Sequence, residues 1–131
     1  FGLASRVEGP AAGQLFRYDD TIHAIQPFGA VPQPAEVRRL FQLDCDGDPQ
    51  LVLVFVAERS ATMRKYGARG LRFLVQEAGH AAQNVGLRLA HDSLAGYVLG
   101  GALDGEILAL FGLHHVDAIL IGAVACGLRP A

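Results

Sequence analysis

The pattern of apolar and polar residues in the first third of the chain predicts strands and one short helix. Residues 1–9 are predicted to form a short strand that ends in a Gly-Pro turn. Apolar and polar positions alternate over residues 14–28, on both sides of two aspartates, which predicts a β-hairpin. Residues 35–42 have helical spacing and are followed by a predicted turn at 44–49. The apolar face of this short helix consists of Val37, Leu40 and Phe41.

One strand and one long helix are predicted for the middle of the chain. Residues 51–58, LVLVFVAE, are continuously apolar, so we expect a strand that is buried on both faces. A helix is predicted from about residue 62 to residue 90. Its apolar stripe consists of Leu71, Leu74, Val75, Ala78, Ala82, Val85 and Leu89. Glycine in a helix interior costs about 1 kcal/mol relative to alanine. Gly79 and Gly86 therefore predict close approach of another helix or of a partner chain.

The last third is predicted to contain a strand with a glycine turn at 94–101, a short helix at 106–113 and a buried strand at 118–127. There is no internal repeat and no linker. These elements predict one α+β domain over residues 1–131, with a small sheet packed on the long helix. The hairpin and the short helix occupy its first 50 residues, and the remaining elements follow.

Composition narrows the class of protein. Only 18% of the 131 residues are charged and the mean hydropathy is +0.29, which excludes a disordered chain. The net charge of −2 argues against a nucleic-acid partner, and no apolar run reaches the length of a membrane span. The hydrophobic share of 51% indicates a buried face beyond the chain's own core. Cys45 and Cys126 do not make a disulfide framework, so we expect a reducing, cytoplasmic setting.

Three segments resemble metal sites but lack essential ligands. DCDGD has aspartates at alternate positions, as an EF-hand loop does, but Pro49 stands where that loop needs glycine. Glu77 and His80 form a single E-x-x-H pair, whereas dimetal carboxylate bundles need two such pairs and further glutamates. His114 and His115 have no third ligand nearby in the sequence. We therefore expect no metal site.

The densest chemical feature is a group of positive charges at the predicted start of the long helix. Five of the 11 basic residues fall within 14 positions, and one of them is the only lysine of the chain. These five are Arg59, Arg64, Lys65, Arg69 and Arg72. Positive charge at a helix start opposes the helix dipole, so stability does not explain this placement. Neighbouring arginines and the dipole would favour the neutral form of Lys65. With Tyr66 beside it, Lys65 suits a general base, although a solvated basic face is the alternative.

The glycine-rich turn is the second candidate binding element. Its order of residues is not the G-x-G-x-x-G of a dinucleotide site. Gly100 and Gly101 would still let a ligand approach the backbone closely, and a plain turn is the alternative.

Taken together, RKYGARGLRFLVQEAGHAAQN, the following LAGYVLGG and the hairpin GQLFRYDDTIHAI carry a family resemblance. They resemble the C-terminal half of the nitroreductase superfamily, and more narrowly the azoline dehydrogenases of thiazole- and oxazole-modified peptide biosynthesis. The resemblance implies a nitroreductase-like fold, an FMN cofactor, a peptide substrate and a homodimer with flavin at the subunit interface. It implies oxidation of peptide thiazolines or oxazolines to azoles.

The same resemblance implies roles for individual residues. Lys65 and Tyr66 match the family's catalytic pair, and Gly100 and Gly101 match the glycine loop beside the flavin. Arg64 and Arg69 are expected to bind the cofactor, and Arg129 is the expected contact to its phosphate.

The family's N-terminal half, whose Arg- and Ser-rich segment grips the FMN phosphate, has no counterpart in this chain. Three explanations stay open. Another chain supplies that half, the chain is part of a longer protein, or it is a flavin-free scaffold subunit. A flavin reductase that acts on another small substrate is a further alternative.

Overall fold

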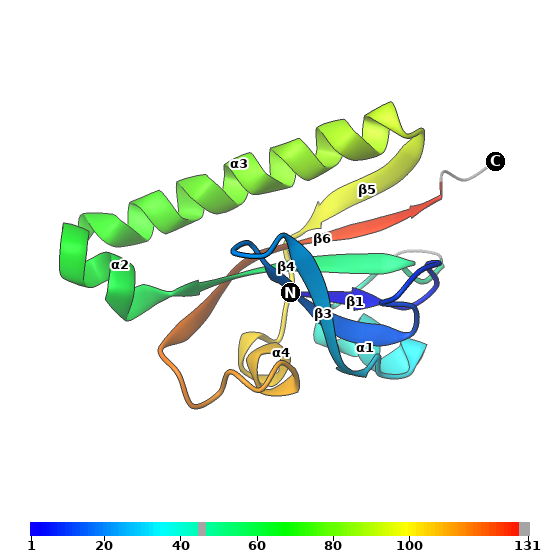
Figure 1. Cartoon of the computed structure of the whole chain (residues 1–131), viewed down its shortest axis with the longest axis horizontal. Helices are drawn as coiled ribbons and strands as arrows, with labels where there is room; N and C mark the ends of the chain where they lie inside the picture. Colours follow the sequence, from blue (N-terminus) through cyan, green and yellow to red (C-terminus); the bar gives the residue numbers. More distant parts are fainter. Residues whose placement is uncertain (45–46, 129–131) are drawn as a thin grey trace.

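The computed structural model describes residues 1–44 and 47–128 and contains one antiparallel sheet with helices on both faces (Figure 1). The sheet has six strands in the order β3-β2-β1-β4-β6-β5. Their bounds are β1 Gly2–Ala4, β2 Gln14–Asp19, β3 Ala24–Ala30, β4 Leu51–Glu58, β5 Leu94–Leu99 and β6 Ala118–Leu128. The helices are α1 Pro34–Leu40, α2 Arg59–Tyr66, α3 Arg69–His91 and α4 Asp104–Leu110. This α+β architecture confirms the predicted fold class.

The N-terminal elements agree with the sequence pattern. Strands β2 and β3 form the predicted hairpin, with Asp19 paired to Ala24 at its end. The Asp19 carboxylate accepts a hydrogen bond from the Thr21 N–H at 3.0 Å, which fixes the turn. Strand β1 lies between β2 and β4, so the predicted first strand is an inner strand of the sheet. Within the predicted turn at 44–49, residues 45 and 46 lie outside the described part of the chain.

Helices α1 and α4 cover one face of the sheet and enclose the main core. Arg39 links the two helices, because its guanidinium bonds the carboxylates of Glu36 on α1 and Glu106 on α4. Helix α4 ends before Gly112, whose φ of +71° favours glycine. The most deeply buried side chains of this core are Phe41, Leu3, Ile107, Val52 and Val54.

The expectation that strand β4 is buried on both faces is wrong. Val52 and Val54 are buried beneath α1 and α4, whereas Leu51 and Leu53 on the opposite face are only half-buried. The long helix α3 packs on β5 and β6 and leaves the β1–β2–β3 part of that face without a helix (Figure 1). A continuous apolar run therefore marks a strand whose second face lacks full cover within this chain.

The single long helix predicted for residues 62–90 is also wrong. Helix α2 ends at Gly67, whose φ of 60° and ψ of −149° no ordinary residue adopts without strain, and α3 starts at Arg69. The predicted apolar stripe faces the sheet only in part. Leu74 and Ala78 are buried, but 47% of Leu71 and 56% of Val75 are exposed.

Helix α3 is 23 residues long, yet over residues 1–44 and 47–128 no helix has both the length and the apolar character needed to cross a bilayer.

Candidate active site

The predicted catalytic pair lies at the corner where α2 meets α3. Lys65 and Tyr66 occupy the last turn of α2, and the Lys65 Nζ is 5.0 Å from the centre of the Tyr66 ring. The Tyr66 ring in turn meets Phe73 of α3 edge to face, with ring centres 5.1 Å apart. Both rings remain partly open to solvent, so a ligand at this corner would find an ammonium, a phenol and an aromatic edge together.

Close packing fixes the angle between the two helices. A side chain on Gly70 would place its Cβ 3.1 Å from the backbone oxygen of Thr62, so glycine permits α3 to start against α2. The Gly67 N–H donates to the Met63 carbonyl and closes the last turn of α2. Lys65 and Tyr66 are therefore held on a backbone that is constrained from both sides.

The helix dipole acts on Lys65 in the opposite sense from the one expected. Arg64 and Lys65 lie in the last turn of α2, where the helix dipole favours positive charge. The argument that the dipole opposes the charge of Lys65 is therefore wrong, because it assumed one continuous helix. The argument holds for Arg69 and Arg72, since α3 begins at Arg69 and has no acidic residue in its first turn.

The two glycines of the predicted loop have different surroundings. A Cβ on Gly101 would lie 2.6 Å from the Gln42 side-chain oxygen, so Gly101 packs closely against Gln42 and a larger residue there would displace that side chain. A Cβ on Gly100 would have no neighbouring atom within 4 Å, so the backbone at Gly100 is open to a ligand.

The glycine loop does not lie beside the catalytic pair. Leu99, the last residue of β5, is opposite Ala123 of β6, whereas Glu58, which precedes α2, is opposite Ala118. Five residues of strand span about 17 Å, and α2 then carries Lys65 beyond the end of β4 (Figure 1). Arg129, the predicted phosphate contact, lies outside the described residues.

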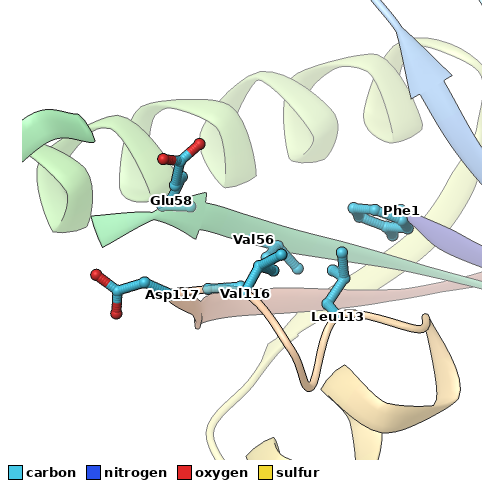
Figure 2. Close-up of a pocket in the computed structure, with 8 residues that line it drawn as sticks. Phe1, Val56, Glu58, Leu113, Val116 and Asp117 are labelled. Atoms are coloured by element: carbon cyan, nitrogen blue, oxygen red, sulfur yellow. The ribbon is translucent and has the colours of Figure 1, made fainter. Parts of the chain in front are cut away.

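A cavity of about 480 Å³ lies at the start of α2, where sequence reasoning identified no site (Figure 2). Its labelled lining residues are Phe1, Val56, Glu58, Leu113, Val116 and Asp117. The carboxylates point away from the apolar centre, and Asp117 is paired with Arg59 at 2.7 Å. The cavity therefore suits an apolar group. The only signal for it in the sequence is the junction of a strand with a charged helix start, which is too common to predict a cavity.

An apolar groove of about 400 Å³ runs between α3 and strands β4, β5 and β6. Four glycines line it, namely Gly79 and Gly86 on α3, Gly96 on β5 and Gly122 on β6. A Cβ on Gly79 or Gly86 would have no atom within 4 Å, so no packing contact among the described residues requires these two glycines. Neither the groove nor the cavity of Figure 2 is lined by Lys65, Tyr66 or Gly100.

Metal ligands are not grouped in the part of the chain that the structure describes. Over residues 1–44 and 47–128, no three His, Cys, Asp or Glu side chains are placed to hold a metal ion. Glu77 and His80 are both exposed on α3, and the rings of His114 and His115 contact each other at an interplanar angle of 54°. The buried Cys126 is the free cysteine of the described residues, and burial raises the pKa of its thiol to about 11.

An antiparallel sheet that carries helices on both faces, with a long helix packed on its outer strands, defines an α+β protein of nitroreductase-like fold. The chain belongs to the nitroreductase family, whose model matches residues 5–128. A protein named as a nitroreductase from Methanocaldococcus jannaschii is 34% identical over 71 residues, which are 54% of this chain and 36% of that protein.

Solved structures show the same fold. A nitroreductase structure from Anabaena variabilis has a TM-score of 0.87 at 21% identity and covers 98% of this chain and 26% of its own. A chain of the E. coli microcin synthetase McbBCD complex with truncated pro-MccB17 bound has a TM-score of 0.81 at 23% identity, over 95% of this chain and 48% of its own. A nitroreductase structure from Ralstonia eutropha has a TM-score of 0.76 at 24% identity, over 91% and 55%. The chain thus spans about a quarter to a half of these relatives.

Proposed function

We propose that this chain is part of an FMN-dependent dehydrogenase that oxidises peptide thiazolines or oxazolines to azoles. The observation that carries the proposal is the Lys65–Tyr66 pair, held side by side on an exposed and cation-rich corner. Membership of the nitroreductase family supports an oxidoreductase. The likeness to a chain of a microcin synthetase complex, whose structure has truncated pro-MccB17 bound, supports the proposal of a peptide substrate.

The residues at hand fit the chemistry of the cofactor. Guanidinium groups of Arg64 and Arg69 suit a phosphate, and the open backbone at Gly100 suits a flat ring that approaches closely. Gly101 packs against Gln42 and thereby holds the loop in place, and we propose that it also contacts the cofactor. Arg129 is also proposed to contact the phosphate of FMN. When bound, FMN accepts the hydride that the azoline loses.

The chain's own residues would handle the proton. Aromatisation removes one hydride and one proton from adjacent positions of the azoline ring, so a positioned base is required. In the proposal, the Lys65 Nζ accepts the proton from the ring carbon and the Tyr66 hydroxyl passes it to solvent. The edge of Phe73 against Tyr66 restrains the phenol, so that the relay stays beside the amine.

The separation of the site elements favours more than one chain in the complete enzyme. Gly100 and Lys65 lie on different parts of one protomer and line no common cavity among those described. We therefore propose a homodimer, or a heteromer with a chain that supplies the N-terminal flavin-binding half. The exposed apolar positions Leu71 and Val75 and the open glycines of α3 offer a surface for such a partner.

A flavin absorption spectrum of the chain with its co-purifying partner tests the hypothesis that the chain is part of an FMN-dependent enzyme. A chain that neither carries flavin nor binds added FMN would instead be a scaffold subunit, which the separated site elements also fit. Bleaching of bound flavin by NAD(P)H would favour the alternative, a flavin reductase with another substrate.

The role of Lys65 has a separate test. Lys65→Ala should abolish azole formation while flavin occupancy stays unchanged. Lys65→Arg is the matched control for charge, since arginine keeps the positive charge but does not give up its proton at physiological pH. Azole formation at the wild-type rate by either variant would remove the catalytic role.

A further inference from the structure

Arginines in this protein have local partners, with one clustered exception. Within residues 1–44 and 47–128, five arginines form ion pairs with carboxylates and Arg6 donates to the Asp48 carbonyl. The five are Arg17, Arg38, Arg39, Arg59 and Arg88. In the same described ranges, no carboxylate lies within ion-pair distance of Arg64, Lys65, Arg69 or Arg72. These four residues are named the basic corner.

The four charges of the basic corner lie within nine positions of the chain, around the junction of α2 and α3. Arg64 and Lys65 close α2, and Arg69 and Arg72 open α3 directly after the Gly67 break. All four are exposed. The charges at the start of α3 oppose its dipole, so they do not stabilise the free chain. A net charge of −2 shows that the corner is a local excess of positive charge in an acidic protein.

A cofactor phosphate alone does not account for this excess. In the proposed function Arg64 and Arg69 bind the phosphate dianion, and Lys65 serves as the base. Arg72 is then left without a counter-charge. Arg72 adjoins Phe73, whose ring meets Tyr66 and is 37% exposed. The first turns of α3 thus carry both an exposed positive charge and a partly open aromatic ring, and this chemistry is complementary to a segment that carries carboxylates next to flat or apolar groups.

We propose that the basic corner is a docking surface for an acidic peptide segment, with Arg72 as a specificity-determining residue. This proposal rests on the proposed function, which supplies the assumption that the substrate is a peptide with an azoline ring. It adds that acidic residues beside the azoline select the substrate. Exposed charge pairs contribute modestly one by one, and several together correspond to about a tenfold change in affinity.

The test is direct binding rather than turnover. Two fluorescent thiazoline peptides are compared by anisotropy, one flanked by glutamates and one by glutamines, with flavin-free protein and its co-purifying partner. We expect the glutamate peptide to bind about tenfold more tightly at low salt, and high salt to remove the difference.

Two matched variants locate the surface. Arg72→Glu and Arg88→Glu change the net charge equally on the same helix, about 24 Å apart along its axis. Arg72→Glu should abolish the preference for glutamate, and Arg88→Glu should retain it. Equal binding of the two peptides, or equal effects of the two variants, would overturn the proposal.

Competition distinguishes the peptide from other anions. If FMN or inorganic phosphate removes the glutamate preference at saturating concentration, the corner is a phosphate site and the proposal fails. Tighter binding of a single-stranded oligonucleotide than of the glutamate peptide would also overturn it. A chain that binds no flavin but prefers the glutamate peptide would contradict the proposed function and leave the docking surface standing.

Discussion

Gly67 provides the sharpest test of how the candidate site is built. It joins α2 to α3 with a φ of 60° and a ψ of −149°, a conformation that is essentially limited to glycine. A Cβ at this position would meet no atom within 4 Å, so Gly67→Ala introduces backbone strain and no clash with neighbours. The substitution therefore isolates one energy term.

The magnitude follows from two opposing effects. Holding alanine in such a conformation costs about 1–3 kcal/mol. Alanine also restricts the unfolded chain, which returns about 0.4–1 kcal/mol of stability. The net prediction is that Gly67→Ala lowers the free energy of unfolding by about 1–2 kcal/mol.

Urea unfolding followed by circular dichroism measures this change, provided that the m-value stays constant. The matched control is Gly79→Ala, because Gly79 has helical backbone geometry in α3 and open space at its Cβ. That control should raise the stability of the free chain by up to about 1 kcal/mol. If Gly67→Ala were as stable as the original chain, a strained break between α2 and α3 would be refuted.

Three further predictions concern the rest of the fold. Arg39→Ala should lower stability at neutral pH and have little effect at pH values below the carboxylate pKa values. Its hydrogen bonds lower the pKa values of Glu36 and Glu106, so their stabilising effect is present above the usual carboxyl pKa and is lost as pH falls through the lowered values. Ile107→Ala should cost about 2–5 kcal/mol, measured by urea unfolding, because this side chain is fully buried. Cys126 should resist alkylation at pH 8 until the chain unfolds, as peptide mass spectrometry can follow, because burial raises its thiol pKa to about 11.

Each of these predictions has a contradicting outcome. An Arg39→Ala deficit that is equal at neutral and acidic pH would show that the guanidinium acts through packing rather than charge. Val98→Ala is the control for Ile107→Ala, since Val98 is 62% exposed and should change stability by less than about 0.5 kcal/mol. Rapid alkylation of Cys126 in the folded chain would contradict its burial.

Local signals in the sequence were sufficient for most elements. Alternation around Asp19 predicts the hairpin because side-chain orientation in a strand depends only on neighbouring residues. The break at Gly67 was missed because Gly67, Gly79 and Gly86 look alike in a helical pattern. In the structure Gly67 differs from the other two by its positive φ, and the packing of Gly70 against Thr62 fixes the helix break beside it. That contact joins two helices, so no local pattern encodes it.

The candidate site likewise combines features that the local sequence predicts with features that depend on tertiary structure. The adjacency of Lys65 and Tyr66 is a property of the sequence, so their proximity could be predicted without a structure. Their separation from Gly100 depends on the register of β5 against β6, which no local pattern encodes. Helical periodicity likewise identifies Leu71 and Val75 as apolar positions but does not say whether this chain covers them.

The position of β6 has a consequence for the order in which the molecule is assembled on the ribosome. Strand β6 lies between β4 and β5, yet it follows both of them in the chain. Until it is synthesised, one backbone edge of β4 stays unpaired beside the apolar side chains of Val52 and Val54, and such edges promote aggregation. The α2–α3 corner is anchored to the same late strand, because the Arg59 N–H donates to the Asp117 carbonyl directly before β6. Nascent chains that stop short of β6 should therefore depend on chaperones and offer no ordered corner to a ligand.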